Sequence, residues 1–182
     1  MRIRPSAPLW AASLALATLS LFVLAPASGA LAVDPPANAQ RKGTGLPLPR
    51  FASLRADEAN VRAGPGTRYP IEWVFRRKGM PVEIVAEFEN YRKIKDWQGA
   101  SGWVHQSLLT GKRSFIIPAK PASLRKTPAK AAEVVAKLEP EVTGEIRSCS
   151  GDWCRVRVSS SGVSGWLERT DLWGVYKSEP IN

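Results

Sequence analysis

The sequence predicts an all-β fold that contains two tandem copies of a small domain. From Phe51 onward, alternating or wholly apolar stretches are separated by turn residues, and no stretch spaces its apolar residues with a helical period. The chain also repeats itself at an offset of 63 residues. Three stretches match their counterparts at this offset: 61–62 with 124–125, 102–104 with 165–167, and 107–109 with 170–172. Because three anchors agree, we expect a tandem duplication, with a single larger β-sandwich as the alternative.

The first thirty residues have the features of a secretory signal peptide. Arg2 and Arg4 precede an apolar run of about sixteen residues, and small residues suited to cleavage follow it. A membrane-spanning helix needs roughly 20 apolar residues, so we expect cleavage over 1–30, with an uncleaved anchor helix as the alternative. The prediction is a periplasmic or secreted protein with no stable membrane span after cleavage.

Residues 31–49 are rich in proline and glycine and contain few large apolar residues. Such a stretch cannot bury enough apolar surface to offset the entropy lost on ordering, which predicts a flexible linker between the signal peptide and the folded part.

The charge of the chain limits its expected partners. The formal net charge is +10, and removal of Arg2 and Arg4 with the signal peptide leaves +8. This charge favours anionic partners such as cell-wall peptide carboxylates, acidic proteins or membrane headgroups. Nucleic acid is not expected, because an exported protein rarely meets it.

The first copy contains a series of predicted strands. In chain order they are 51–55, 61–62, 72–75, 81–88, 91–95 and 102–105, with a single helical turn near 107–109. Glu89 and Asn90 separate two of these strands and are suited to a tight hairpin turn.

The stretch Asn60–Thr67 reads Asn-Val-Arg-Ala-Gly-Pro-Gly-Thr. We expect Gly64 and Gly66 to turn the chain through positive φ, while Pro65 presets its own φ. The stretch resembles the N-V-R-x-G-P-x-T signature of bacterial Src-homology-3-like domains, and residues 102–104 fit the Gly-Trp-Val that ends the same domain. The resemblance implies two small SH3-like β-barrels, over 50–112 and 113–177, that serve as binding modules.

The second copy departs from the signature. Its loop reads Lys-Thr-Pro-Ala-Lys over 126–130 and contains no glycine. We therefore expect another turn geometry there, and a second domain that acts as a structural partner rather than as an equivalent binding site.

Two cysteines, Cys149 and Cys154, bracket four residues suited to turning a hairpin. Across adjacent strands they would lie within disulfide reach, and an oxidising compartment favours the bond. Closing so short a loop stabilises the fold by about 2 kcal/mol. A redox-active pair is the less favoured interpretation, because the spacing is not Cys-x-x-Cys.

The sequence does not favour an enzyme, and we expect no catalytic residues, metal site or cofactor. His105 is the only histidine, no Gly-x-Ser-x-Gly elbow is present, and both cysteines are expected in the disulfide. Glu87, Glu89 and Asp96 could serve a carboxylate-pair hydrolase, but no pattern selects them.

Small barrels recognise extended peptides through aromatic grooves flanked by charges. The predicted groove of the first domain consists of Arg62, Tyr69, Trp97 and Trp103, with Arg62 paired to a ligand carboxylate. For Tyr69 a place in the core is the alternative, and Trp97 could instead cap its own barrel.

The resemblance implies a cell-wall targeting module, a role that such domains often have beside a hydrolase domain. No hydrolase domain is apparent here. We therefore expect an exported, non-catalytic binder of cell-wall peptide or glycan, with a periplasmic protein–protein adaptor as the alternative.

Overall fold

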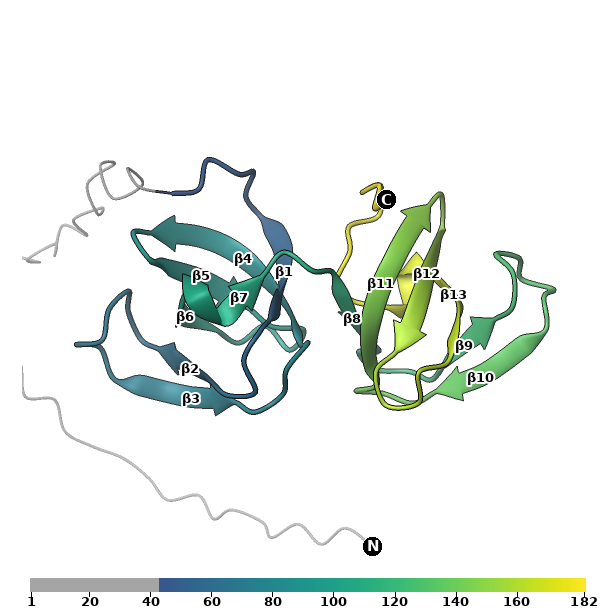
Figure 1. Ribbon diagram of the computed structural model, residues 1–182, viewed down its shortest axis with the longest axis horizontal. Coiled ribbons are helices and arrows are strands. Elements are labelled where there is room, and N and C mark those ends of the chain that lie inside the picture. The colour runs from purple at the N-terminus through teal and green to yellow at the C-terminus, as the bar shows by residue number, and fades with distance from the viewer. Residues whose placement is uncertain (1–42) are drawn as a thin grey trace, which may run out of the picture. The chain divides into compact units, whose positions relative to one another are not determined.

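The computed structural model describes residues 43–182, all of which belong to one compact unit (Figure 1). The predicted signal peptide and the predicted linker as far as residue 42 lie outside the described residues. The first copy comprises β1 (Arg50–Leu54), β2 (Ala59–Arg62), β3 (Ile71–Phe75), β4 (Pro81–Phe88), β5 (Tyr91–Lys95), β6 (Ser101–His105), η2 (Gln106–Leu108) and β7 (Leu109–Thr110). The second comprises β8 (Ser114–Ile116), β9 (Ala122–Arg125), β10 (Val134–Leu138), β11 (Thr143–Ser150), β12 (Trp153–Val158), β13 (Ser164–Glu168) and η3 (Arg169–Asp171).

The all-β prediction is confirmed for the described residues, whose only helical elements are the short 3₁₀ helices η2 and η3. Strands β4 and β5 have the predicted bounds, and Glu89 and Asn90 connect them. Glu89 has a φ of 47°, the left-handed conformation that a two-residue hairpin turn requires.

Each copy forms its own antiparallel sheet. The first sheet has the strand order β3-β2-β6-β5-β4-β1-β7, and the second has the order β10-β9-β13-β12-β11-β8. Both orders have two free ends, so the sheets are open and not the closed barrels that we expected. Strand β7 has only two residues and β8 has three, and Ile116 of β8 exchanges backbone hydrogen bonds with Trp173 instead of with the opposite edge strand.

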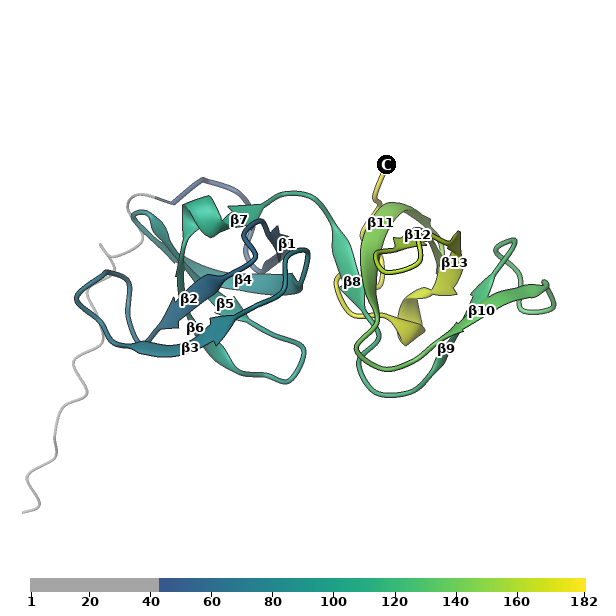
Figure 2. The same ribbon diagram turned by 60° about the horizontal axis from the view of Figure 1, so that its bottom comes forward.

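The sheets are related as a tandem repeat. Strands β2 to β6 of the first sheet correspond in order and pairing to β9 to β13 of the second (Figure 2). The register also shifts at corresponding points, between Ile84 and Ala86 in one sheet and between Ile146 and Ser148 in the other. We call residues 50–110 the first repeat and residues 114–173 the second repeat.

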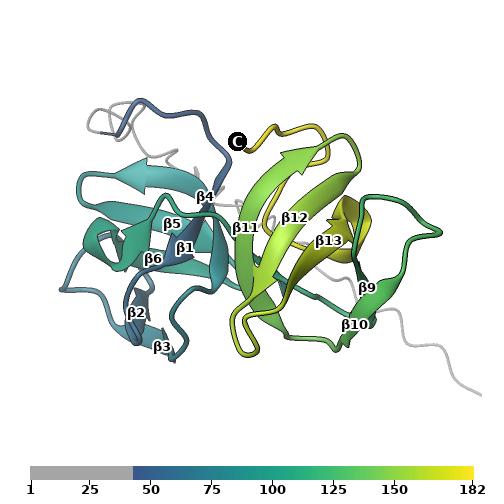
Figure 3. The same ribbon diagram turned by 45° about the vertical axis from the view of Figure 1, so that its right-hand side comes forward.

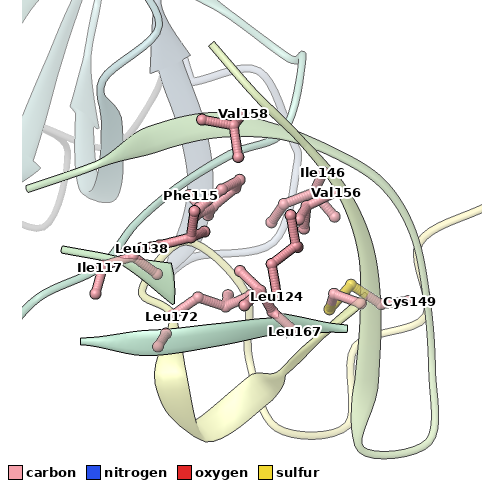
Figure 4. Close-up of a cluster of buried hydrophobic side chains, with 12 residues drawn as sticks. Phe115, Ile117, Leu124, Leu138, Ile146, Cys149, Val156, Val158, Leu167 and Leu172 are labelled. Atoms are coloured by element: carbon pink, nitrogen blue, oxygen red, sulfur yellow. A yellow bond between two sulfur atoms is a disulfide. The ribbon is translucent and has the colours of Figure 1, made fainter. Parts of the chain in front are cut away.

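Each repeat has its own hydrophobic core, formed by alternate residues of its strands. In the first repeat Val61, Val82, Ile94 and Val104 are among the buried members. The core of the second repeat is shown in Figure 4 and consists of Phe115, Ile117, Ala122, Leu124, Leu138, Ile146, Cys149, Cys154, Val156, Val158, Leu167 and Leu172.

Strand β8 contributes to both cores. Phe115 belongs to the core of the second repeat, whereas the next residue, Ile116, belongs to the core of the first. Trp173 pairs with Ile116 across an isolated bridge and packs against the core of the first repeat. Tyr176 donates a hydrogen bond from its hydroxyl to Glu83 Oε1 at 2.7 Å. Burial, and then this hydrogen bond, raise the pKa of Tyr176.

The predicted disulfide joins Cys149 to Cys154. The two residues lie opposite each other on the neighbouring strands β11 and β12 (Figure 3), with their Cα atoms 4.1 Å apart, and both are buried. Figure 4 shows the bond beside Cys149. The bond therefore ties one hairpin of the second repeat together at the edge of its core.

The described end of the predicted linker makes specific contacts. Thr44 donates hydrogen bonds from its amide and its hydroxyl to the carboxylate of Glu87, and Arg50 pairs with the same carboxylate. Burial raises the pKa of Glu87, but the bonds from Arg50 and Thr44 outweigh it and hold the pKa below its usual range. Residues 44–50 are thus anchored to the end of β4.

Candidate binding surface

Four side chains form a row across the outer face of the first sheet. The strand pairings place Ile71 of β3, Arg62 of β2, Trp103 of β6 and Lys93 of β5 opposite one another in turn. Directly paired residues have their Cβ atoms about 5 Å apart. The positions next to Arg62, Lys93 and Trp103 on β2, β5 and β6 are buried, so these three side chains face outward, and Ile71 of β3 is itself exposed. We call these four residues the first row.

Two of the predicted site residues, Arg62 and Trp103, therefore lie together in the first row. Arg62 also holds the loop that follows it, because its Nη1 donates to the carbonyl oxygens of Tyr69 at 2.8 Å and Thr67 at 3.3 Å. Both bonds use Nη1, and among the described residues Nη2 and Nε have no hydrogen-bond acceptor. Arg62 is thus a positioning residue that retains donors for a carboxylate.

Tyr69 borders the first row through this loop. Its ring packs against Gly64, where a Cβ atom would lie 2.5 Å from ring atom Cδ1. The guanidinium of Arg68 lies 5.1 Å from the ring centroid, which is a cation–π contact. Tyr69 is half-buried. Neither Gly64 nor Gly66 has a positive φ, so the prediction for these glycines was wrong. Gly64 is required by close packing, not by backbone conformation.

Trp97 is not part of this surface. It lies in the β5–β6 turn, where Asp96 Oδ1 accepts hydrogen bonds from the amides of Gln98 and Ala100 at 3.0 and 2.9 Å. The half-buried indole packs against the core of the first repeat. The structure therefore favours the cap over a ligand contact for Trp97.

Sequence reasoning missed Lys93 and the neighbouring pair Tyr91 and His105. These two rings lie edge to face with centroids 5.3 Å apart, on the same face as the first row. His105 Nδ1 also lies 2.7 Å from Ser107 Oγ and caps η2. The alternation of buried and outward residues along β5 and β6 was the signal that could have identified all three residues.

The second repeat carries a corresponding row of Val134, Arg125, Trp166 and Arg155 on β10, β9, β13 and β12. We call it the second row. Arg125 Nη1 donates to the carbonyl oxygen of Ala132 at 2.8 Å, as Arg62 does to that of Tyr69. The arrangement of an apolar residue, an arginine, a tryptophan and a cation is therefore duplicated.

The loops beside the two rows have the same backbone hydrogen bonds. In the first repeat they join Ala63 N to Pro70 O, Gly66 N to Gly64 O, and Tyr69 N to Gly66 O. In the second they join Lys126 N to Glu133 O, Ala129 N to Thr127 O, and Ala132 N to Ala129 O. The expectation of another turn geometry was therefore wrong. Ala132 replaces the tyrosine, and this leaves space for the side chain of Thr127.

The glycine before each tryptophan allows the strands to cross closely. A Cβ atom on Gly102 would lie 2.4 Å from Val61 Cγ1, and one on Gly165 would lie 2.7 Å from the carbonyl oxygen of Arg125. Each Gly-Trp pair thus combines a strand crossing that only glycine permits with an indole on the outer face.

A cleft of ≈ 670 Å³ adjoins the second row. It is lined by Lys130, Asp152, Trp153, Glu168, Arg169, Thr170, Val175 and Lys177. Lys130 Nζ lies 3.9 Å from Glu168 Oε2. Nearby, burial raises the pKa of Asp171, and the negative charge of Glu168 raises it further.

Within residues 43–182, no group of three or more His, Cys, Asp or Glu side chains could hold a metal ion. The same residues include no helix that is long and apolar enough to cross a membrane. Glu87 and Asp96, which we considered as hydrolytic carboxylates, are engaged with Arg50, Arg92 and a turn. The outward faces of the two sheets present aromatic and cationic side chains in the two rows.

Comparison with known families identifies both repeats. Residues 55–111 and 119–174 each match the bacterial SH3 domain. The chain belongs to the bacterial SH3 domain family. The two matched stretches fall one in each sheet, and β1 and β8 lie just before them.

A curated relative of this bacterial SH3 protein is Bacillus subtilis (strain 168) YrvJ, named as an N-acetylmuramoyl-L-alanine amidase. The two are 26% identical over 127 residues, which cover 64% of this chain but only 24% of YrvJ. Among solved structures, NlpC2 from Trichomonas vaginalis matches 69% of this chain and 48% of its own, with 11% identity and a TM-score of 0.33. An NlpC/P60 family protein from Bacillus cereus ATCC 10987 matches 70% of this chain and 57% of its own, with 16% identity and a TM-score of 0.31.

Proposed function

We propose that this bacterial SH3 protein binds a peptide or glycan of the cell wall, outside the cytoplasm, through the first row and the adjoining Tyr69. The observation that carries the proposal is the alignment of Arg62, Trp103 and Lys93 across three adjacent strands. An indole between two cations matches a ligand that offers an apolar or sugar face next to a carboxylate.

The relative supports the chemical class of this ligand. YrvJ is named for the linkage between N-acetylmuramic acid and L-alanine, a linkage that joins a glycan to a peptide. The net charge, +10 for the full chain and +8 without Arg2 and Arg4 of the predicted signal peptide, favours association with a polymer that carries carboxylates. The proposed role is binding without catalysis, since His105 caps η2 and both cysteines form a disulfide.

The direct test is co-sedimentation of the purified protein with isolated peptidoglycan at low and moderate salt. Arg62→Ala would also release the loop that Arg62 holds, so Lys93→Gln and Trp103→Phe are the more selective variants. Lys120→Gln is the matched control, because it removes the same charge at an exposed position outside the row. We expect retention at moderate salt that falls at least fivefold in both row variants and not in the control.

Equal loss of retention at moderate salt for the unmodified protein, Lys93→Gln, Trp103→Phe and Lys120→Gln would overturn the proposal. It would mean only that a basic protein associates with an anionic polymer. Absence of retention at any salt concentration would overturn it as well.

A protein–protein adaptor is the second candidate, and the free edges of the sheets favour it. Strands β3 and β10 are edge strands that expose Ile71, Val134 and Val135, each about 45% accessible. An edge strand with apolar side chains can pair with an extended segment of another protein. The adaptor would take precedence if peptidoglycan failed to retain the protein.

A further inference from the structure

The cleft beside the second row combines charges of both signs around an apolar base. Trp153 and Val175 supply the apolar surface, and Val175 packs against the core of the second repeat. Glu168 lies directly opposite Trp153 on the neighbouring strand, so its carboxylate borders the indole. Asp152, the residue before Trp153, also lines the cleft.

The cationic groups occupy the remaining walls of the cleft. Arg169 is fixed there, because its Nε and Nη1 donate to the carbonyl oxygens of Gly151 and Tyr176. Lys130 and Lys177 are exposed, and the side chain of Lys130 is 83% accessible. The separation of 3.9 Å between Lys130 and Glu168 lies at the limit of an ion pair, so each group can engage a ligand at little cost.

The corresponding region of the first repeat has different chemistry. Tyr91 and His105 stand where Trp153 and Glu168 do, and Thr67 stands where Lys130 does. Gln106, at the position of Arg169, donates to Asn90 Oδ1 at 3.0 Å and accepts from Arg92. The mixed charges are therefore a property of the second repeat and not of the duplicated scaffold.

We propose that the cleft of the second repeat binds a zwitterionic peptide segment, one that carries a free ammonium group and a free carboxylate separated by a short apolar stem. The ammonium group meets Glu168 and Asp152, the carboxylate meets Lys130 and Lys177, and the stem lies over Trp153. The proposal rests on the proposed function only in taking the cell-wall peptide as the natural source of such a segment.

The test is an NMR titration of the purified protein with N-acetyl-Ala-Lys, which carries one ammonium group and one carboxylate. Matched probes are its Nε-acetylated form, which lacks the ammonium group, and its carboxyl-terminal amide, which lacks the carboxylate. The readout is the indole N–H signal of Trp153, assigned with Trp153→Phe. We expect the unmodified peptide to bind at least fivefold more tightly than either blocked form.

Variants assign each charge to its partner. Glu168→Gln is expected to remove the preference for the free ammonium group, and Lys130→Gln is expected to weaken the preference for the free carboxylate. Glu133→Gln is the control, because this carboxylate is exposed on the same β9–β10 hairpin as Lys130 and pairs with Lys126 outside the cleft. It is expected to leave both preferences intact.

Equal binding of the three peptides, or no shift of the Trp153 signal at 20 mM peptide (about a hundredfold excess), would overturn the inference. The titration contains no cell wall and does not involve Lys93. A negative titration would therefore overturn this inference without affecting the result of the peptidoglycan experiment. Likewise, a loss of peptidoglycan binding through the first row would not affect the titration.

Discussion

The two repeats fasten the same hairpin in different ways. Strands β4 and β5 place Glu87 opposite Arg92, whereas β11 and β12 place Cys149 opposite Cys154 at the corresponding position. In the first repeat Arg92 Nε lies 3.1 Å from Glu87 Oε1, and both side chains are almost fully buried. In the second repeat a disulfide makes the connection. The same cross-strand position is thus linked by a buried ion pair in one repeat and by a covalent bond in the other, and we expect both links to stabilise their hairpins.

The largest effect that tests this comparison is expected from Glu87→Gln. The substitution leaves the guanidinium of Arg92, only 4% accessible, without its counter-charge. Removing one partner of a buried pair costs about 3–5 kcal/mol. Because Arg92 also donates to the carbonyl oxygens of Glu89 and Tyr91, we expect a loss near the lower limit in the free energy of unfolding, about 3 kcal/mol.

Urea denaturation measures this loss, and reduction of the disulfide provides the comparison in the second repeat, with an expected loss of about 2 kcal/mol. Glu58→Gln is the control, because its pair with Arg76 is exposed and contributes less than about 1 kcal/mol. A loss for Glu87→Gln no larger than that of the control would contradict the equivalence of the two links.

An intermediate effect is expected from exchanging the loop residues of the two repeats. Gly64→Thr introduces a Cβ atom 2.5 Å from the ring of Tyr69 and should destabilise the fold by about 1–3 kcal/mol. In the Tyr69→Ala background, which reproduces Thr127 and Ala132 of the second repeat, the same substitution should cost far less. A double-mutant cycle in urea measures this coupling. Additive losses would show that the ring is not the reason for the glycine.

The contact between Gly64 and Tyr69 also shows which features could not be predicted from the sequence. The all-β fold, the tandem repeat and the Cys149–Cys154 bond could be predicted, because alternation, the repeat offset and the cysteine spacing can be read directly from the sequence. The role of Gly64 could not, since a glycine that admits a neighbouring ring and a glycine that needs positive φ look identical in a sequence.

The candidate surface was predicted in part for a similar reason. Arg62 and Trp103 follow from their motifs, but Lys93 and Ile71 join them only through the register of four strands. That register shifts between Val61 and Arg62, where β3 contributes an extra residue. No local sequence pattern predicts such a bulge. The open sheets were not predicted either, because pairing between the two edge strands of a sheet depends on strand lengths that are known only from the folded structure.

The smallest effect concerns the dependence of stability on pH. The pKa of Glu87 is lower in the folded protein than the value of about 4.3 expected when unfolded. Its contribution is therefore complete above about pH 4.3 and is lost as the pH falls through the lowered pKa. We expect the wild-type free energy of unfolding to decrease below about pH 4. Glu87→Gln should decrease less over the same range, and parallel curves would contradict this assignment.

The two rows offer the most informative comparison for function. Both place a tryptophan between an arginine and a second cation, and both arginines hold the adjoining loop through a carbonyl oxygen. They differ at the aromatic border, where Tyr69 of the first repeat is replaced by Ala132. If the rows are binding surfaces, each should contribute to retention, and the first row should contribute more.

The most direct measurement of this claim is retention on peptidoglycan at moderate salt for Lys93→Gln, Arg155→Gln, the double variant and Lys120→Gln. We expect a larger loss for Lys93→Gln than for Arg155→Gln, near-complete loss for the double variant, and no loss for Lys120→Gln. Equal retention of all four variants, with each protein still folded, would contradict it.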